Sequence, residues 1–218
     1  MMLRQPLRTV RTVRAAGFTL VEALIAMAVL AVMLAIGVPR MADWLSATRA
    51  AAAGGFYAEG MAVARSQALA NNSASRLVLS RNSASGQYDW QVDVCFPNRE
   101  APCSNVAGAW STLQDAVKPV QDAGAGVKSI VRYADGLPGT DRIAVTPGPD
   151  GATAVYFTQL GWVDTRVETR MMRIDVAPAS SAATAGGFRA TSVVLTLGGV
   201  AASCNPAAAA GDSRRCPE

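Results

Sequence analysis

The feature that most constrains this chain is an uninterrupted apolar run near its N-terminus. The segment Phe18 to Val38 is 21 residues long, and its only polar members are Thr19 and Glu22. A helix rises about 1.5 Å per residue, so this segment is long enough to cross the roughly 30 Å hydrocarbon layer of a membrane. A carboxylate inside such a segment is costly and usually functional, which makes Glu22 the first candidate functional residue.

A basic leader without any acidic residue precedes the apolar run. Its arginines are Arg4, Arg8, Arg11 and Arg14. An ordinary signal peptide or signal anchor is one interpretation, but a secretory peptide has its small-residue cleavage site after the apolar core. Here the small residue Gly17 comes before the core, and no A-x-A site follows it. This order predicts cleavage between the leader and the helix, with the helix retained.

The residues at this junction match a known signal. Gly17, Phe18, Thr19, Leu20 and Glu22 carry every fixed position of the pattern G-F-T-L-x-E, which resembles the class III signal of the type IV prepilin family. The resemblance implies that a prepilin peptidase cuts after Gly17 and that the new N-terminal residue, Phe18, is N-methylated. It also implies that Glu22 pairs with the Phe18 amine of a neighbouring pilin in a helical filament. A buried charge is tolerated when an opposite charge meets it, which gives the pairing a physical basis.

Pro39 follows the apolar run and has two interpretations. It stands where many pilins have a helix-bending proline, and a proline inside a helix removes one backbone hydrogen bond. Alternatively, Pro39 marks the exit of the membrane segment.

Charge and the leader together predict how the chain is arranged about a membrane. Four of the 20 lysines and arginines lie in the leader, so the remaining 16 match the 16 acids and the processed chain is formally neutral. A neutral chain gives no argument for nucleic acid from global charge. The leader charges favour cytoplasmic retention of the N-terminus, which leaves a single-pass inner-membrane protein with a periplasmic domain. The expected parts are a leader (1–17), a transmembrane and polymerisation helix (18–39), an amphipathic continuation (40–72) and a β-rich domain (73–218).

The four cysteines agree with an oxidising compartment. Cys95 and Cys103 enclose a short loop that contains proline, and Cys204 and Cys216 enclose a second loop near the C-terminus. Four cysteines allow three pairings, and the two local pairings are favoured because each frames a turn-rich segment. A zinc site is the alternative, but the chain has no C-x-x-C spacing and no histidine.

The helical pattern continues after Pro39 to about Ala70, where Asn71-Asn72-Ser73 ends it. Gly54-Gly55 weakens the middle of this stretch, so two helices broken at that point are an alternative. The side chains expected on one apolar face are Met41, Trp44, Leu45, Ala52, Phe56, Val63 and Leu69.

The remainder of the chain is expected to form strands. Residues 88–96 alternate clearly, with Tyr88, Trp90, Val92, Val94 and Phe96 on one face. Further expected strands are 76–80, 130–133, 143–146, 154–158, 171–176 and 192–197, separated by turn signals such as Asp135-Gly136 and 147–151. The predicted fold class is α+β, with a long N-terminal pilin helix packed on an antiparallel two-sheet domain.

This strand half is similar to the GspH/FimT family of minor pilins and pseudopilins. The resemblance rests on the F-x-x-x-G pattern from Phe157 to Gly161 and on the late strand that ends at Val200. Gly199 departs from the family, in which arginine is common at this position, and the tail 207–216 is an Ala-rich insertion. The resemblance implies a minor type IV pilin in the tip or priming complex, with other minor and major pilins as partners. Alternatives are an H-type pseudopilin of type II secretion or a FimT-like pilin that binds DNA during transformation.

The composition argues against an enzyme. Without histidine, a Ser-His-Asp or Cys-His site cannot form, and no cofactor, metal or small-molecule substrate is expected. Asp89 and Asp93 alternate with the apolar face of a strand and are expected to face solvent. The turns at Asp135-Gly136 and 149–151 lack the regular acids of a calcium loop.

Arg214 and Arg215 are candidate DNA-binding residues. Certain FimT-like pilins bind DNA through C-terminal arginines, and two adjacent guanidinium groups held by a disulfide loop could engage phosphates. The competing interpretation is a solvated tail neutralised by Asp212 and Glu218.

Overall fold

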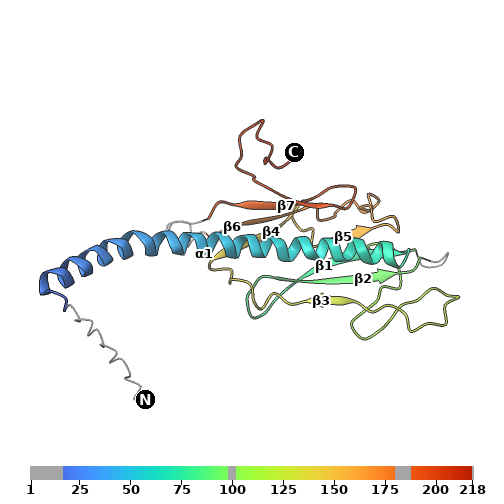
Figure 1. The fold of residues 1–218 in the computed structure, drawn as a ribbon. Coiled ribbons are helices and arrows are strands. Elements are labelled where there is room, and N and C mark those ends of the chain that lie inside the picture. The colour runs from blue at the N-terminus through green and yellow to red at the C-terminus, as the bar shows by residue number, and fades with distance from the viewer. Residues whose placement is uncertain (1–16, 98–101, 180–187, 218) are drawn as a thin grey trace, which may run out of the picture. The chain divides into compact units, whose positions relative to one another are not determined.

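The computed structural model describes residues 17–97, 102–179 and 188–217. The chain divides into two compact units, residues 1–42 and 43–218. One helix, α1 (Leu20–Ala70), begins in the first unit and ends in the second (Figure 1). Eight strands follow it: β1 (Ala74–Arg81), β2 (Tyr88–Cys95), β3 (Ile130–Arg132), β4 (Ile143–Gly148), β5 (Ala154–Phe157), β6 (Arg173–Pro178), β7 (Thr191–Leu195) and β8 (Ala201–Cys204).

Both ends of α1 are capped. The Thr19 hydroxyl accepts a hydrogen bond from the Glu22 backbone N–H at 3.2 Å, which satisfies one of the free donors of the first turn. At the other end Asn72 has a left-handed backbone, with φ 44°. The Ser73 N–H donates to the Ala68 carbonyl and the Asn72 N–H to the Leu69 carbonyl, which is the Schellman pattern of a helix end. The expected end of the helix at residues 71–73 is confirmed.

The helix is continuous through Pro39 and through Gly54-Gly55, so the alternative of two helices broken at the glycines is wrong. The N-terminal part of α1 is long and apolar enough to cross a membrane. Every described side chain from residue 17 to residue 45 is exposed.

The strands form two four-stranded antiparallel sheets. The first has the order β3-β2-β1-β5 and the second β4-β6-β7-β8. β1 and β2 pair along their full lengths, with Leu77 opposite Val92. β6 pairs with β4 on one side and β7 on the other. The predicted α+β class with two antiparallel sheets is confirmed, and each predicted strand lies within two residues of an observed one.

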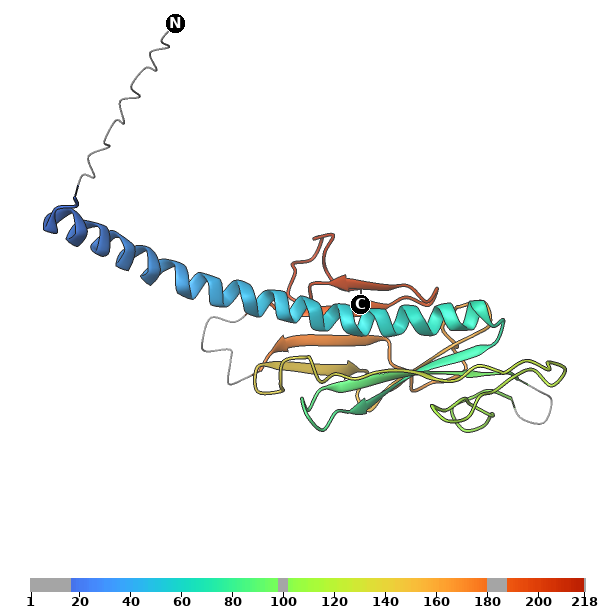
Figure 2. The same cartoon turned by 60° about the horizontal axis from the view of Figure 1, so that its bottom comes forward.

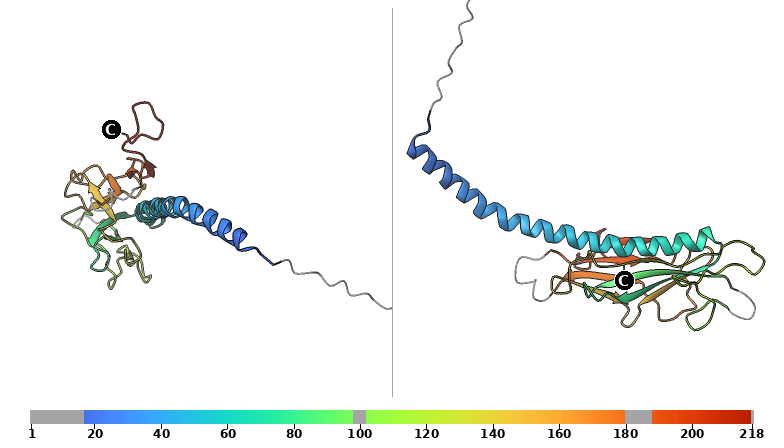
Figure 3. Two further views of the ribbon diagram at one scale, coloured as in Figure 1. Left: turned by 90° about the vertical axis from the view of Figure 1, so that its left-hand side faces the viewer. Right: turned by 90° about the horizontal axis from the view of Figure 1, so that it is seen from below.

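Residues 43–70 of α1 lie along both sheets, as Figures 2 and 3 show. A Cβ on Gly60 would come within 3.0 Å of the Trp90 ring on β2, and one on Gly54 within 3.6 Å of Val193 on β7. The Ser75 hydroxyl donates to the Ala64 carbonyl at 2.6 Å. Small residues at the contact therefore let the helix backbone approach the sheets closely.

The predicted apolar face of this helix is largely wrong. Met41, Trp44, Leu45 and Leu69 are among the exposed large hydrophobic residues, and Ala52 is exposed as well. Of the expected set, only Phe56 is buried, and Val63 is partly buried. The face that meets the sheets is composed instead of Ala50, Ala53, Phe56, Tyr57, Met61, Ala64 and Ala68. Large apolar side chains mark this face only at Phe56, Tyr57 and Met61, and alanine fills its other positions because the helix approaches the sheets closely.

The prediction that Asp89 and Asp93 face solvent is also wrong, because both side chains are buried. Asp93 accepts hydrogen bonds from Arg76 Nε at 2.8 Å, Gln91 Nε2 at 2.7 Å and Ser129 Oγ at 2.6 Å. Asp89 accepts from the Asn82 amide and from a backbone N–H. The segment between β2 and β3 covers Asp93 through Ser129, whereas Asp89 is covered by Asn82 after β1 and Ala134 after β3.

Candidate functional site

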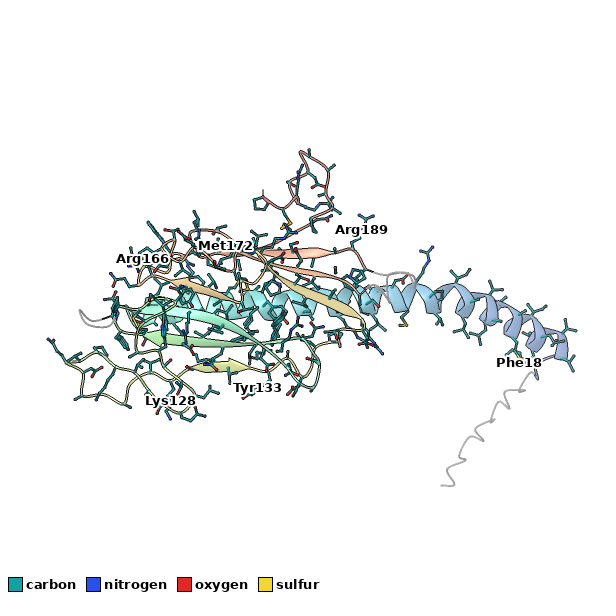
Figure 4. The ribbon with its side chains drawn as sticks, turned by 180° about the vertical axis from the view of Figure 1, so that it is seen from behind. Phe18, Lys128, Tyr133, Arg166, Met172 and Arg189 are labelled. Carbon is teal, nitrogen blue, oxygen red and sulfur yellow. A yellow bond between two sulfur atoms is a disulfide. The ribbon has the colours of Figure 1, made fainter. Side chains whose placement is uncertain are left out.

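The candidate site is the start of α1, where the predicted processing and assembly residues lie. Apart from its chain neighbours, no described residue has an atom within 4 Å of the position a Cβ on Gly17 would take, so nothing in the described part of the chain packs on Gly17. Phe18 follows with 82 % of its surface exposed. Its side chain is labelled at the first turn of α1 in Figure 4.

Thr19 and Glu22 have the T-x-x-E spacing of a capping box, of which the bond from the Glu22 N–H to the Thr19 hydroxyl is formed. Thr19 stands just before Leu20, the first residue of α1, and its hydroxyl meets the Glu22 N–H. Spacing of the T-x-x-E kind places a carboxylate in the first helical turn, where the partial positive charge of the helix end favours it. From the sequence, Thr19 was predicted only as part of the signal, although its spacing to Glu22 is also a known indication of a helix start.

The Glu22 side chain is exposed and has no hydrogen-bond or ion-pair partner among the described residues. All its described neighbours along the helix to Val38 are apolar or small. A carboxylate in this setting can bind an external cation at the helix start. The arginines of the leader lie outside the described residues.

The four cysteines form two disulfides, Cys95–Cys103 and Cys204–Cys216. These are the two local pairings that the sequence favours, and no described cysteine is free. The first disulfide joins the end of β2 to the segment between β2 and β3. The second ties the C-terminal tail to the end of β8, beside a bridge between Asn205 and Arg215. No group of three or more His, Cys, Asp or Glu residues in the described parts of the chain could hold a metal ion.

The candidate DNA-binding arginines are already engaged locally. Arg214 Nη2 lies 3.0 Å from Asp212 Oδ2, and Arg214 Nε donates to Asp212 Oδ1 at 3.2 Å. The side-chain hydrogen bond from Arg214 holds the pKa of the Asp212 carboxyl below its usual value. Arg215 takes part in the bridge to Asn205. Arg214 is thus paired with the acid that the competing interpretation named, whereas Glu218 lies outside the described residues.

Comparison with known proteins identifies the N-terminal segment alone. The family model described as the prokaryotic N-terminal methylation motif matches residues 13–38. No curated protein and no solved structure matches the chain. The matched residues include the Gly17–Phe18 junction, the Thr19 cap and Glu22. The motif implies processing by a prepilin peptidase and assembly with other pilins, and it supports a type IV pilin-like protein.

Proposed function

We propose that this chain is a minor type IV pilin, a structural subunit of a tip or priming complex that supports pilus assembly and hence twitching motility or adhesion. The observation that carries the proposal is the exposed Glu22 carboxylate in the first turn of an apolar helix, directly after the Gly17–Phe18 junction. The domain that follows belongs, in this proposal, to the GspH/FimT kind and lies in the periplasm before assembly.

The charge at position 22 explains how processing and assembly are coupled. A carboxylate costs about 2.5–3.5 kcal/mol at the centre of a membrane helix on insertion scales, and less in the first turn, where Glu22 stands. Cleavage after Gly17 creates an amine on Phe18, a cation at the same end of the helix in every processed subunit. Pairing of Glu22 with the Phe18 amine of a neighbour offsets the cost only in the assembled state. Uncleaved subunits lack this cation and are therefore poor partners.

An H-type pseudopilin of a type II secretion system is the alternative, because the same N-terminal segment serves both machines. The second disulfide and its C-terminal loop favour the pilus. The DNA-uptake role is less well supported, since the Arg214 guanidinium is paired with Asp212.

The first test is deletion of the gene, with surface pili sheared and quantified, and complementation by the wild-type gene. We expect loss of pili that complementation restores. Normal pili together with loss of exoprotein secretion would instead assign the chain to the secretion machine. Normal pili with lost transformation would revive the DNA-uptake role.

The second test replaces the acid in the complemented strain. Glu22→Ala should leave membrane insertion and leader cleavage intact while lowering incorporation into sheared filaments at least tenfold. The matched control is Met27→Leu, an exposed apolar exchange in the same segment. Mass spectrometry of the processed chain should show an N-terminal peptide that begins with N-methylated Phe18. Equal incorporation of Glu22→Ala and wild type would contradict the assembly role of this residue.

A further inference from the structure

A cleft lies at the C-terminal end of α1, where four segments distant in sequence meet. It is lined among others by Asn71, Asn72, Phe96, Val117, Gln121 and Gln159. Figures 1 and 2 show the segment between β2 and β3 extending beside this end of the helix. Nothing in the N-terminal motif accounts for the cleft.

Each wall of the cleft is held by local structure. The Schellman turn that ends α1 fixes the backbone of Asn72. The Cys95–Cys103 disulfide holds the chain directly before Phe96. Val117 exchanges two backbone hydrogen bonds with Val127, which closes a hairpin that presents Gln121. Gln159 lies in a turn closed by the hydrogen bond that the Thr158 N–H donates to the Trp162 carbonyl. The site is therefore built from secured segments.

Three carboxamide side chains line the cleft without a partner. Asn72, Gln121 and Gln159 are exposed side chains that make no side-chain hydrogen bond to any described residue. Asn71 differs, because its amide nitrogen donates to the Gln67 carbonyl at 2.9 Å. The charged lining residue is Lys118, whose Nζ lies 3.4 Å from the Gly124 carbonyl oxygen. The lining contains no acidic residue.

This combination of groups matches the chemistry of a sugar. A carboxamide both donates and accepts hydrogen bonds, as a sugar hydroxyl does. Each of these side-chain amides can therefore donate a hydrogen bond to a sugar hydroxyl or accept one from it. The Phe96 ring and the Val117 side chain offer apolar surface for the C–H faces of a pyranose ring. Binding sites for small ligands commonly combine apolar walls with a few oriented polar groups.

Other ligand classes fit the cleft less well. None of its lining residues belongs to a named strand, so it offers no sheet edge to which an extended peptide could add. A polyanion such as a nucleic acid is bound through several cations, whereas the lining provides one lysine.

We propose that this cleft binds a neutral saccharide. The proposal goes beyond assembly: it gives the domain a recognition surface for neutral glycans at the end of α1 remote from the assembly segment in sequence. Binding by the isolated chain requires no filament, so its outcome is separate from that of the pilus assays.

The test uses the full chain, solubilised in a polyoxyethylene ether detergent because maltoside detergents themselves carry sugar. The probe is an array of immobilised neutral, sialylated and sulfated oligosaccharides, followed by titration with the strongest soluble neutral oligosaccharide. We expect the wild type to bind neutral glycans. Gln159→Leu and Gln121→Leu should each weaken that binding at least fivefold, because they remove the amide at similar size.

The matched control is Gln114→Leu, an exposed glutamine between β2 and β3 that does not line the cleft. It should bind as the wild type does. Circular dichroism and complete disulfide formation verify that each variant is folded. Absence of binding by the folded wild type, binding confined to acidic glycans, or equal binding by both cleft variants and the control would each overturn the proposal.

Discussion

At the scale of single residues, Gly199 occupies a position that only glycine fits. Its φ is 77°, and a Cβ at this position would lie 2.2 Å from the Gly161 carbonyl oxygen. The same carbonyl accepts a hydrogen bond from Arg65 Nε at 3.2 Å. Any side chain at this position would collide with this backbone. The Arg65 side chain of α1 also lies against this position, with its Cδ 3.1 Å from where that Cβ would stand.

Replacement of Gly199 should be destabilising. Gly199→Ala should lower the free energy of unfolding by about 2–3 kcal/mol, because it combines a strained left-handed backbone with a clash against a carbonyl. Gly198→Ala is the control, since the nearest atom to its Cβ is Thr196 Oγ1 at 3.8 Å. Chemical denaturation of both variants in detergent provides the measurement. A similar cost for both would show that Gly199 is not special.

The buried hydroxyl of Tyr57 should make the stability of the domain depend on pH in the alkaline range. Its side chain is fully buried, and the hydroxyl donates to the Tyr88 carbonyl at 3.1 Å while accepting from the Tyr88 N–H at 3.2 Å. Burial raises the pKa of Tyr57 to about 12. Between about pH 10 and pH 12 the unfolded chain has lost this proton and the folded chain retains it. The stabilisation that the protonated Tyr57 hydroxyl contributes to the folded state is therefore complete below pH 10 and is lost as the pH rises toward 12.

The expected loss of unfolding free energy between pH 10 and pH 12 is about 3 kcal/mol, from two pKa units at 1.36 kcal/mol each. Tyr57→Phe should remove this part of the pH dependence. It should also cost about 1–3 kcal/mol at neutral pH, because the Tyr88 backbone groups lose their partner. Unfolding curves of both proteins at several pH values test this. An unchanged alkaline slope in the variant would contradict the assignment to Tyr57.

At the scale of elements, polar contacts attach the segment between β2 and β3 to the first sheet. Asp93 is 1 % exposed and accepts a hydrogen bond from the hydroxyl of Ser129 in this segment. Ser111 accepts the Val94 N–H and shares a hydrogen bond with Ser129. The Arg76 guanidinium, paired with Asp93, lies 4.5 Å from the centre of the Trp110 ring. Asp93 is thus the centre of the contact.

Asp93→Ala should loosen this attachment. Breaking a buried ion pair costs typically about 3–5 kcal/mol, but the Arg76 side chain is 24 % exposed and stays partly hydrated. We therefore expect a loss of about 2 kcal/mol in unfolding free energy, with faster hydrogen exchange at residues 111–129. Asp150→Ala, at an exposed turn, is the control. Unchanged exchange in Asp93→Ala would mean that other contacts hold the segment.

The sequence predicted secondary structure correctly where one hydrophobic pattern extends over a whole element. Strand β2 and the long apolar stretch of α1 follow directly from alternation and from length. Strand β8 (Ala201–Cys204) was missed because two alanines, a serine and a cysteine carry little strand preference. The buried face of α1 was misassigned because alanine and glycine at a close contact give no hydrophobic period. The burial of Asp93 depends on a segment returning from elsewhere in the chain, which alternation within one strand does not reveal.

At the scale of the whole molecule, the N-terminal motif and the hydrophobic core lie in different parts of the sequence. The residues of the N-terminal motif are contiguous, so the sequence alone revealed the segment that carries it. The cleft was not predicted, since its lining comes from four segments that meet only in the folded domain. The hydrophobic core begins at Ala50, and no residue of the apolar run belongs to it. The domain should therefore fold without that run.

A fragment of residues 43–218 should be soluble, form both disulfides and unfold cooperatively. A fragment of residues 71–218 should not fold, because it lacks Phe56, Tyr57 and Met61 from the core. Loss of large buried side chains costs about 2–5 kcal/mol each. Three such losses, on the order of 10 kcal/mol together, equal the whole stability of an ordinary domain. Circular dichroism, thermal unfolding and thiol titration compare the two fragments. Equal stability of both would mean that the sheets fold without α1, whereas failure of the longer fragment would give the apolar run a role in the folding of the domain.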